Sequence, residues 1–418
     1  MRQRRRSVLT LLVAASLGLL TLAAAGCSAS AAAPAVNSPA AQALASPTLL
    51  PTLRPTATAA VFELKPSSTP PPSATPIPTL AAQPITNGEY LPSNYNPLTG
   101  LLVSEPANLE RRPVAIKITN FPRHVRPQWG LSLADHVYEY YLEDLITRFI
   151  AVFYGNNAER VGPVRSGRFF DENIVRMYKS FFVFAWADDR VVLPWTDSDL
   201  RNFLVVERED NCPPMCRIGP AYDYNTLFVD TFALKDYIAA RRTDNSRQDL
   251  SGLSFGQVPP YSPRAGEQVY VRFSDFSYNR WDYDPLTNRY LRFEDALDAV
   301  QAPPAYAPLT DSLTAAPIAA DNLVILLVRH EYFANTPTTE MVTMNFLGEG
   351  DAYALRDGRI YPARWQRSTA PDLLRLTDPD GRPYLLKPGN VWYEVLGESS
   401  SMIQDSVSKA WMFDFAIP

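Results

Sequence analysis

A long tract of Ala, Pro, Ser and Thr most strongly limits what this chain can fold into. It runs from residue 28 to about residue 88 and contains about a dozen prolines, few charges and little aromatic content beyond Phe62. Such a composition cannot bury enough apolar surface to offset the entropy of ordering the chain. We therefore expect a semi-extended linker here, and a folded part that begins near residue 89.

The chain opens with the features of a secretory signal. Four arginines within the first six residues precede an apolar run from Val8 to Ala25, which ends in small residues. The stretch Ala24-Ala25-Gly26-Cys27 resembles the lipobox that lipoprotein signal peptidase reads, in which the Cys becomes diacylated and N-terminal. We therefore expect a signal peptide over 1–26, a lipid on Cys27 and a lipid-anchored linker over 27–88. A plain transmembrane anchor is the alternative, because about 18 apolar residues can just span a bilayer.

Charge and location follow from this leader. Without the leader's four arginines the formal charge changes from −5 to −9. A chain this acidic is a poor binder of nucleic acid. We expect the folded part to lie outside the cytoplasm, lipid-anchored to a membrane of the cell envelope, with no nucleic-acid partner.

Two cysteines remain after lipidation, Cys212 and Cys216, in the stretch Cys-Pro-Pro-Met-Cys. Outside the cytoplasm a local disulfide is the default for such a pair. A zinc site would need two more ligands, and the three histidines of the chain form no paired motif nearby. Free thiols are the remaining alternative. We expect the disulfide, with no metal ion and no cofactor, because a Gly-rich nucleotide loop is also missing from the sequence.

The folded part is long enough for two domains. We expect an α+β domain over 89–256 and a β-rich domain over 257–418, which meet in the Pro- and Gly-bearing stretch Gly256 to Gly266. In the first domain, apolar residues at helical spacing predict helices over 171–182 and 231–242. Runs of β-branched and aromatic residues predict its strands at 113–120, 135–141 and 146–154.

The second domain is expected to be almost wholly β. Asp357-Gly358 and Asp380-Gly381 are typical of tight hairpin turns. Runs of strand length occur at 268–273, 290–293, 322–329, 340–346 and 391–396. The predicted fold class is therefore α+β, with a mixed N-terminal part and a β-rich C-terminal part.

Unusual residues are concentrated between Asn120 and Arg168. After Asn120, at the end of a predicted strand, this segment contains Arg126-Pro-Gln-Trp-Gly-Leu-Ser-Leu-Ala-Asp135, Tyr138-Glu139, Thr147-Arg148 and Gly162-Pro-Val-Arg-Ser-Gly-Arg168. These motifs resemble those of the YerB-like lipoproteins, a family with the two-part domain of unknown function 3048.

The resemblance covers most of the folded part. It continues through Tyr283-Asp284, Arg292, Asp357-Gly358, Trp365, Gly381 and Pro388-Gly389-x-x-Trp392. One departure is Leu142-Glu-Asp-Leu145, where the family usually has a Glu-Gly-Gly type of turn. The resemblance implies a membrane-anchored extracytoplasmic protein without an established activity, so the residues have to be weighed by their own chemistry.

The charged residues of this segment allow two main interpretations. Strand alternation predicts that Asp135 and Glu139 share one face, with Arg148 on a neighbouring strand. In the first interpretation, these carboxylates pair with Arg148, Arg165 and Arg168 in a buried structural network, because the guanidinium fork binds carboxylates well. In the second, the same groups form a pocket for an anion at the helix start near Asp171. Its candidate residues are Asn120, Gln128, Asp135, Glu139, Arg148, Arg165, Ser166 and Arg168.

A catalytic carboxylate is a third interpretation. Paired carboxylates hydrolyse glycosides, but the sequence does not fix the separation of Asp135 and Glu139. Gly252-Leu-Ser-Phe-Gly256 has the pattern of a nucleophile elbow without the flanking strand and helix that this motif needs. We therefore expect a non-catalytic envelope protein that binds a wall polymer, a lipid-linked phosphate or another envelope protein. The alternative is an envelope hydrolase or transferase that uses Asp135 or Glu139.

Overall fold

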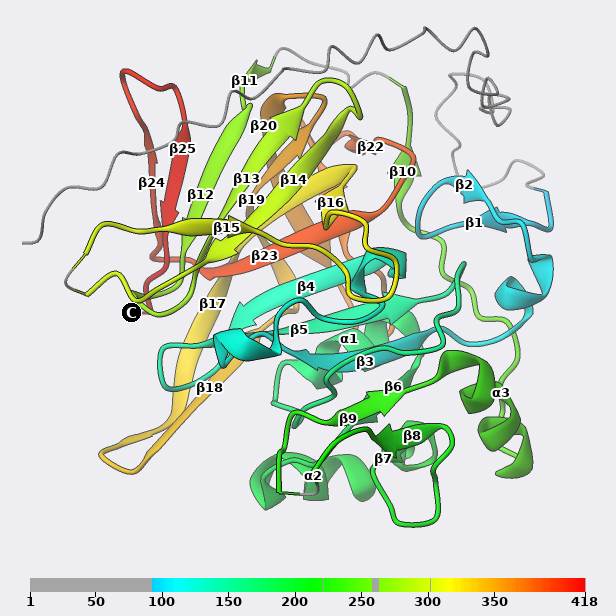
Figure 1. Cartoon of the computed structure of the whole chain (residues 1–418). Coiled ribbons are helices and arrows are strands. Elements are labelled where there is room, and N and C mark those ends of the chain that lie inside the picture. The colour runs from blue at the N-terminus through cyan, green and yellow to red at the C-terminus, as the bar shows by residue number, and fades with distance from the viewer. Residues whose placement is uncertain (1–91, 221, 258–262, 301, 418) are drawn as a thin grey trace, which may run out of the picture. The chain divides into compact units, whose positions relative to one another are not determined.

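The structure, a computed structural model, describes residues 92–220, 222–257, 263–300 and 302–417. The predicted signal peptide 1–26, the lipidation site Cys27 and the linker 27–88 lie outside these residues. The described residues form an α+β fold dominated by strands, as the sequence predicts (Figure 1).

In the described part of the chain, twelve strands form one large sheet that draws on both predicted domains. Ten of them follow one another in the order β11, β20, β19, β17, β23, β4, β5, β3, β6 and β7, while β18 pairs with β17 and β21 with β20. Their bounds are Arg264–Ala265 (β11), Arg359–Arg367 (β20), Gly348–Arg356 (β19), Asn322–Thr336 (β17), Val391–Gly397 (β23), His136–Tyr141 (β4), Thr147–Phe153 (β5), Val114–Thr119 (β3), Phe181–Phe184 (β6), Leu204–Val206 (β7), Thr339–Asn345 (β18) and Arg375–Thr377 (β21).

The strand directions bring several strand ends to one edge of this sheet. β17, β23 and β4 run parallel to one another, and β3, β6 and β7 are also mutually parallel. β5 lies between β4 and β3 and is antiparallel to both. The carboxyl ends of β4, β3 and β6 therefore meet at the same edge as the start of β5. In open α/β sheets, ligands bind at this kind of edge.

A second sheet packs against one face of the first. Its strands follow the order β15, β14, β13, β12, β25 and β24, with β16 paired to β14. Trp281 of β13 meets Trp392 of β23 with ring centroids 5.2 Å apart, so the two sheets share a core. The bounds are Tyr306–Pro308 (β15), Arg289–Asp295 (β14), Tyr278–Asp284 (β13), Gln268–Arg272 (β12), Trp411–Asp414 (β25), Ser401–Gln404 (β24) and Ala319–Ala320 (β16).

The helices belong to the first predicted domain. Within the described residues there are three α-helices, Asp171–Tyr178 (α1), Asp189–Thr196 (α2) and Thr231–Ala240 (α3). α1 lies against the face of β4 opposite to the second sheet (Figure 1). There the hydroxyls of Tyr138 and Tyr178 form a hydrogen bond of 2.8 Å. Short 3-10 turns are Pro106–Glu110, Arg123–Val125, Leu131–Leu133 and Asp199–Phe203.

Three small ladders complete the strand inventory of the described residues. Each contains two strands. They are β1 with β2 (Tyr95–Asn96 and Leu101–Leu102), β10 with β22 (Ser254–Phe255 and Leu385–Leu386) and β8 with β9 (Met215–Arg217 and Leu227–Val229). The predicted disulfide between Cys212 and Cys216 is present just before and within β8.

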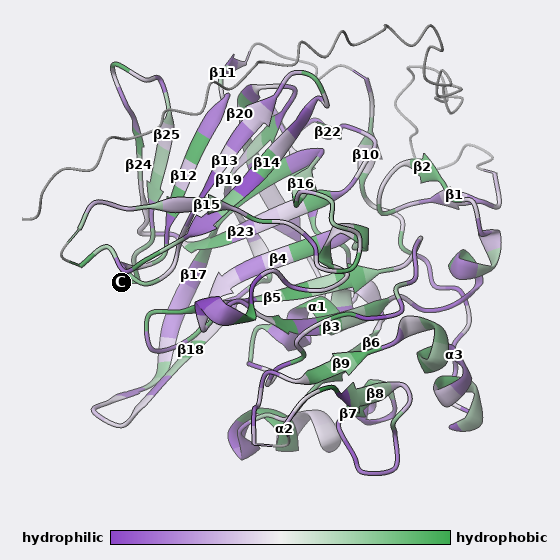
Figure 2. Cartoon of the chain, viewed as in Figure 1, coloured by the Kyte–Doolittle hydropathy of each residue, from purple (hydrophilic) through white to green (hydrophobic). Residues whose placement is uncertain are grey.

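Burial explains why the central strands form where they do. β3, β5 and β6 are buried along their whole length and carry mostly hydrophobic residues (Figure 2). Continuous apolar runs of this kind are typical of strands covered on both faces. The buried apolar residues of both predicted domains form one cluster. Residues 258–262 are not described, so the boundary near residue 257 stays a prediction.

Most predicted strands are confirmed. In the first part, β3, β4 and β5 fall inside the ranges 113–120, 135–141 and 146–154. In the second part, β12, β14, β18 and β23 match their predicted ranges within about two residues, whereas β17 runs seven residues beyond 329. Asp357 and Gly358 form the two-residue turn between β19 and β20, both with positive φ.

The helix predicted over 171–182 is wrong at its C-terminal end. α1 stops at Tyr178 because Lys179 adopts a left-handed conformation with a φ of 50°. Phe181 then donates its N–H to the carbonyl of Pro113 at 3.0 Å, and β6 joins β3. Packing in the sheet thus overrides the helical spacing of these phenylalanines. The helix predicted over 231–242 is confirmed as α3, which Asp230 caps.

Candidate functional site

The predicted charged residues are divided between the two faces of the large sheet. In the register of β4 and β5, Glu139 lies opposite Phe149, and Arg148 lies opposite Tyr140. Because successive side chains of a strand point to opposite faces, Glu139 and Arg148 are separated by the sheet. The predicted pairing of Glu139 with Arg148 is therefore wrong, although Arg148 does lie on the strand beside β4.

Asp135 forms a buried structural contact just before β4. Asp135 is only 2% exposed. Its carboxylate accepts hydrogen bonds from the Asn96 amide at 2.7 Å and from the N–H groups of Tyr154 and Gly155 at 2.6 and 3.0 Å. Burial raises the pKa of Asp135, and the backbone N–H groups partly offset this. The predicted pairing of Asp135 with the three arginines is also wrong, because these neighbours occupy both of its oxygens.

Glu139 belongs to a buried network centred on Arg292, a residue that sequence reasoning did not select as a site residue. Arg292 donates to Glu139, to Glu394 at 2.9 Å and to Glu294 at 2.6 Å. None of these four residues is more than 3% exposed. A single guanidinium thus faces three carboxylates between the two sheets.

Aromatic rings surround the Arg292 guanidinium. Its central carbon lies 4.5 Å from the ring centroid of Trp392, 5.0 Å from that of Trp281 and 5.3 Å from that of Phe149. The Trp281 indole N–H also donates to Glu394 at 2.9 Å. Cation–π attraction and this hydrogen bond help to hold a charge in a dry interior.

Asn120 and Gln128 attach to the same network rather than to an open pocket. Asn120 donates its amide to Glu139 at 3.2 Å, and its Oδ1 accepts from Arg126 at 3.1 Å. Gln128 donates to the carbonyl of Thr119 at 3.1 Å. Both predicted residues are 1% exposed or less. They position Glu139 and the loop of Arg126, and they do not face solvent.

Burial dominates the titration of this network. It raises the pKa of Glu139 well above its usual value, and the negative charges of Glu394 and Glu294 act in the same direction. Burial also raises the pKa of Glu394, although the positive charge of Arg292 opposes this effect. The arrangement therefore favours a protonated carboxyl inside the network.

The other face of the sheet carries the remaining predicted arginines at the carboxyl edge. Arg148 is the second residue of β5, and its Nη1 donates to the carbonyl of Ser166 at 3.0 Å. Arg165 follows Val164, whose bridge to Ile118 of β3 places the loop beside that strand. The Arg165 N–H donates to the carbonyl of Lys117 at 3.0 Å. Loop 162–168 therefore pairs with the C-terminal half of β3 and brings Arg165 near Arg148.

These two arginines have no acidic partner. Among the described residues, neither Arg148 nor Arg165 forms an ion pair, and the Nε of Arg165 is buried without a hydrogen bond. Burial, together with the charges of Arg168 and Arg165, lowers the pKa of Arg148 to about 9. Burial and the Arg168 charge likewise lower the pKa of Arg165. Two adjacent cations thus lie together without a carboxylate of the described residues at ion-pair distance, and the charges of Glu143 and Asp223 act on them only from farther away.

The third arginine of the cluster, Arg168, is neutralised by a carboxylate. Arg168 forms a forked pair with Glu143, which lies in the Leu142–Leu145 turn where the sequence differs from the usual family pattern. Ser166 contributes its carbonyl to Arg148, and no hydrogen bond of its hydroxyl is found within the described residues. Arg148, Arg165 and Arg168 therefore lie close together as predicted. The carboxylate that pairs within this cluster is Glu143, not Asp135 or Glu139.

Lys117 lies beneath this cluster and was missed as a site residue. It is fully buried and contacts the Tyr140 hydroxyl and, at 3.1 Å, the carboxylate of Asp171. Burial lowers the pKa of Lys117 to about 7, while the charge of Asp171 raises it in part. A lone lysine in an otherwise apolar strand was the available signal, since an unpaired charge in such a position is rare.

The start of α1, the predicted anion site, carries a carboxylate of the chain itself. Asp171, the first residue of α1, accepts the N–H of Arg168 at 2.7 Å and also contacts Lys117 and Tyr140. The negative charge of Asp171 makes this helix start a poor place for an external anion.

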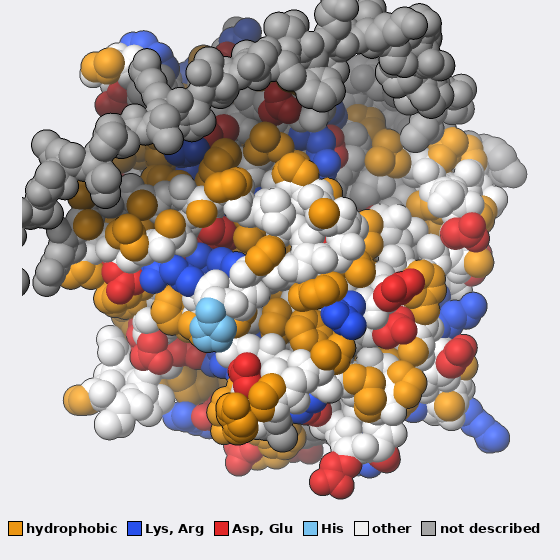
Figure 3. Space-filling model, in the orientation of Figure 1, with side chains coloured by type: hydrophobic (Ala, Val, Ile, Leu, Met, Phe, Trp, Pro, Cys, Tyr) orange, Lys and Arg blue, Asp and Glu red, His pale blue; other side chains and the backbone are white. Residues whose placement is uncertain are grey.

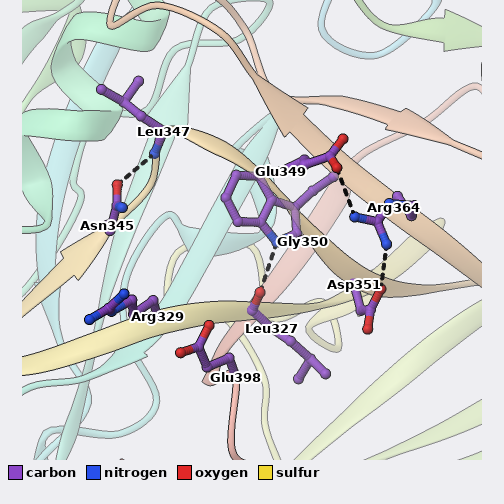
Figure 4. Close-up of a pocket in the computed structure, with 10 residues that line it drawn as sticks. Leu327, Arg329, Asn345, Leu347, Glu349, Gly350, Asp351, Arg364 and Glu398 are labelled. Carbon is purple, nitrogen blue, oxygen red and sulfur yellow. Dashed lines mark hydrogen bonds and ion pairs between the residues drawn. The ribbon is translucent and has the colours of Figure 1, made fainter.

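A separate cavity of about 340 Å³ lies among β17, β18, β19 and β20. In Figure 4, Arg364 reaches both Glu349 and Asp351, at 3.1 and 3.0 Å, and the Trp365 indole donates to the carbonyl of Leu327. None of the sequence-predicted residues lines it. On the face shown in Figure 3, basic and acidic side chains are interspersed, without one dominant sign of charge.

The architecture and these motifs define a two-part α+β protein, and both parts match known families. "Protein of unknown function (DUF3048) N-terminal domain" matches residues 98–244, and "Protein of unknown function (DUF3048) C-terminal domain" matches residues 269–393. The chain belongs to the YerB-like family, so the resemblance predicted from its motifs is confirmed.

A curated relative and a solved structure support this assignment. The protein named "Putative lipoprotein YerB" from Bacillus subtilis (strain 168) is 28% identical over 313 residues, which cover 72% of this chain and 85% of the relative. The crystal structure of the Bacillus subtilis YerB protein superposes with a TM-score of 0.61 and 22% identity, over 72% of this chain and 96% of that one. The solved structure supports the fold, and the relative's name is consistent with a lipoprotein. Within the described residues, no helix has the length and apolar character to cross a bilayer.

Proposed function

We propose that this protein is a non-catalytic, lipid-anchored binding protein of the cell envelope, and that Arg148 and Arg165 hold an anionic group of its ligand. The observation that supports this most is the pair of adjacent arginines without a carboxylate partner at the carboxyl edge of β3, β4 and β6. A phosphate or carboxylate that binds there would satisfy donors that the protein leaves unpaired.

The ligand class is inferred from the positive charges of Arg148 and Arg165, not from the net charge of the chain. The mature chain carries a formal charge of about −9 once its leader is removed, so its overall field repels anions. Recognition therefore depends on close contact with the two arginines. A wall polymer, a lipid-linked phosphate and an acidic segment of an envelope protein all offer the required group.

The geometry gives little support to the alternative of a hydrolase or transferase. A catalytic carboxylate must come within hydrogen-bond reach of its substrate. Asp135 and Glu139 are at most 2% exposed, and both are occupied by hydrogen bonds within the protein. We therefore place the ligand at the arginines and assign no reaction to these two carboxylates.

The anchor is the second part of the proposal. The leader and Cys27 support lipidation, and the relative's name agrees with it. Cys27→Ala should leave the chain without incorporated palmitate analogue and release it from washed membranes. Continued labelling of the variant would show that the lipid is elsewhere.

Anion binding is tested by thermal unfolding of the full-length chain in neutral detergent. Added inorganic phosphate should raise the melting temperature of the wild type, because a ligand that binds only the folded state stabilises it by about 2.7 kcal/mol at 100 times its Kd. Arg165→Ala should abolish this gain. Arg329→Ala is the control, since Arg329 is an exposed arginine (60%) on another strand, β17. A wild type that is indifferent to phosphate and to sulfate would remove the anion site.

A further inference from the structure

An exposed tryptophan stands beside the arginine pair. Trp186 is 58% exposed, whereas every other tryptophan of the described residues is buried or half-buried. Trp186 follows the carboxyl end of β6, the strand parallel to β3. Large exposed indoles are uncommon on monomeric proteins and mark contact surfaces when polar groups surround them.

Backbone hydrogen bonds fix Trp186 next to the loop of Arg165. Ala185 donates its N–H to the carbonyl of Arg165 at 3.0 Å, and the carbonyl of Trp186 accepts the N–H of Gly167 at 2.7 Å. The end of β6 therefore pairs with loop 162–168, just as the loop pairs with β3 on its other side.

The sheet register relates the position of Trp186 to that of the arginines. Extending the β3 and β6 register sets Phe184, the last residue of β6, opposite Lys117, and Trp186 lies two residues beyond it. Lys117 shares its face with Arg148, because Ile150 is its partner on β5. Arg148 and Arg165 thus lie on one face of the sheet, on the two sides of β3, and Trp186 follows the end of β6 on the far side of loop 162–168.

We infer that the anionic group is carried by a sugar, and that the sugar ring packs on Trp186 while its phosphate or carboxylate reaches Arg148 and Arg165. This inference rests on the proposed function and names the ligand class for that same site. A sugar ring has a flat face of C–H groups that matches an indole, and burying that face removes apolar surface from water.

Because the arginines are more deeply buried than Trp186, the arrangement fits a ligand with a small charged group attached to a larger ring. Arg148 is 6% exposed, so only a small anion can reach its guanidinium. Trp186 lies at the surface and can take the ring that carries the anion. The turn between β8 and β9 adds Tyr222 and Tyr224, which are 84% and 70% exposed. Leu227, which begins β9 just after this turn, accepts the N–H of Val164 at 2.7 Å, so the turn lies near loop 162–168.

The test compares three probes on the full-length chain in neutral detergent by calorimetry. Glucose 6-phosphate should bind the wild type about tenfold more tightly than inorganic phosphate, and glycerol 3-phosphate, which has no ring, should bind like inorganic phosphate. Trp186→Ala should lower the affinity for glucose 6-phosphate to that for inorganic phosphate and leave the latter unchanged. Phe232→Ala is the control, because Phe232 is a similarly exposed aromatic residue on α3 (54%).

The outcomes separate this inference from the proposed function. Equal binding of all three probes, or an unchanged affinity of Trp186→Ala for glucose 6-phosphate, would overturn the inference of a sugar ligand. The proposed anion site would still stand. Tighter binding of a phosphoserine peptide than of glucose 6-phosphate would also overturn it in favour of a protein ligand. Failure of the wild type to bind any phosphate compound would refute the proposed function and the inference together.

Discussion

Glu139 and Glu394 stand directly opposite each other on the parallel strands β4 and β23, and neither residue is more than 1% exposed. Arg292 contacts both carboxylates but supplies only one positive charge. The second oxygen of Glu394 is buried and receives no hydrogen bond from the described residues. Two such carboxyls titrate as a pair, and this pair retains a proton at a pH where exposed glutamates have lost theirs.

We expect Glu394→Gln to stabilise the protein relative to wild type as the pH rises. The pKa of Glu394 is raised by burial, so its contribution to stability is fully present below the unfolded-state pKa of about 4.3 and is lost as the pH rises through the folded-state pKa. Each pH unit within this window contributes at most about 1.4 kcal/mol. Urea unfolding from pH 4 to pH 8 measures the difference between the two proteins. Glu349→Gln, at an exposed site, should follow wild type throughout; a constant difference between Glu394→Gln and wild type would contradict the shared proton.

Arg292→Met should destabilise the protein strongly. The change leaves three carboxylates in the interior without their common cation, and loss of one partner of a buried ion pair costs about 3–5 kcal/mol. Urea unfolding at pH 7 gives the free energy directly, with the exposed Arg329→Met as control. The loss should shrink at acidic pH, where the carboxylates are protonated. A loss below about 1 kcal/mol would mean that aromatic packing, rather than charge, holds this core.

Arg165→Ala and Arg168→Ala should differ in stability. Arg165 has no acidic partner, so its removal should change the free energy of unfolding by less than about 0.5 kcal/mol. Arg168 shares a forked pair with Glu143, and its removal should cost about 1–3 kcal/mol. Thermal unfolding of both variants without added anions decides the point. A large loss in Arg165→Ala would identify it as a structural residue.

Anion affinity should fall as the pH rises through about 7. Burial lowers the pKa of Lys117 to about 7, and its charge lies beneath Arg148 and Arg165. Sulfate is the suitable probe because its own charge is constant in this range. We expect its affinity to drop roughly fivefold between pH 6 and pH 8, which corresponds to about 1 kcal/mol. Lys117→Met should bind sulfate at pH 6 as weakly as wild type does at pH 8. A flat wild-type profile would mean that Lys117 does not act on the site.

Local sequence patterns were sufficient to predict most of the strands. β3, β4 and β5 are apolar enough and short enough to be identified from β-branched and aromatic residues alone. The pattern failed at Phe181 and Phe182, whose spacing also suits a helix. Their strand is decided by pairing with Val114 and Ala115, and a contact so distant in sequence leaves no local trace.

The candidate site was harder to predict because it depends on register. Arg148, Arg165 and Arg168 lie close together as predicted, but Arg148 was assigned the wrong partners. A one-residue difference in strand phase moves a side chain to the other face, and only the pairing of Arg148 with Tyr140 fixes that phase. Arg292, the true partner of Glu139, lies 153 residues away and could not be matched to it from a single sequence.

The pairing of β23 with β4 ties the two family halves into one obligate folding unit. If translation stopped after residue 257, β4 would be left as a bare edge, with unpaired N–H and C=O groups beside a carboxylate that has lost its counterion. Exposed edges of this kind recruit strands from other chains and promote aggregation. Truncated forms should therefore accumulate as insoluble material, and each half depends on the other to remain soluble.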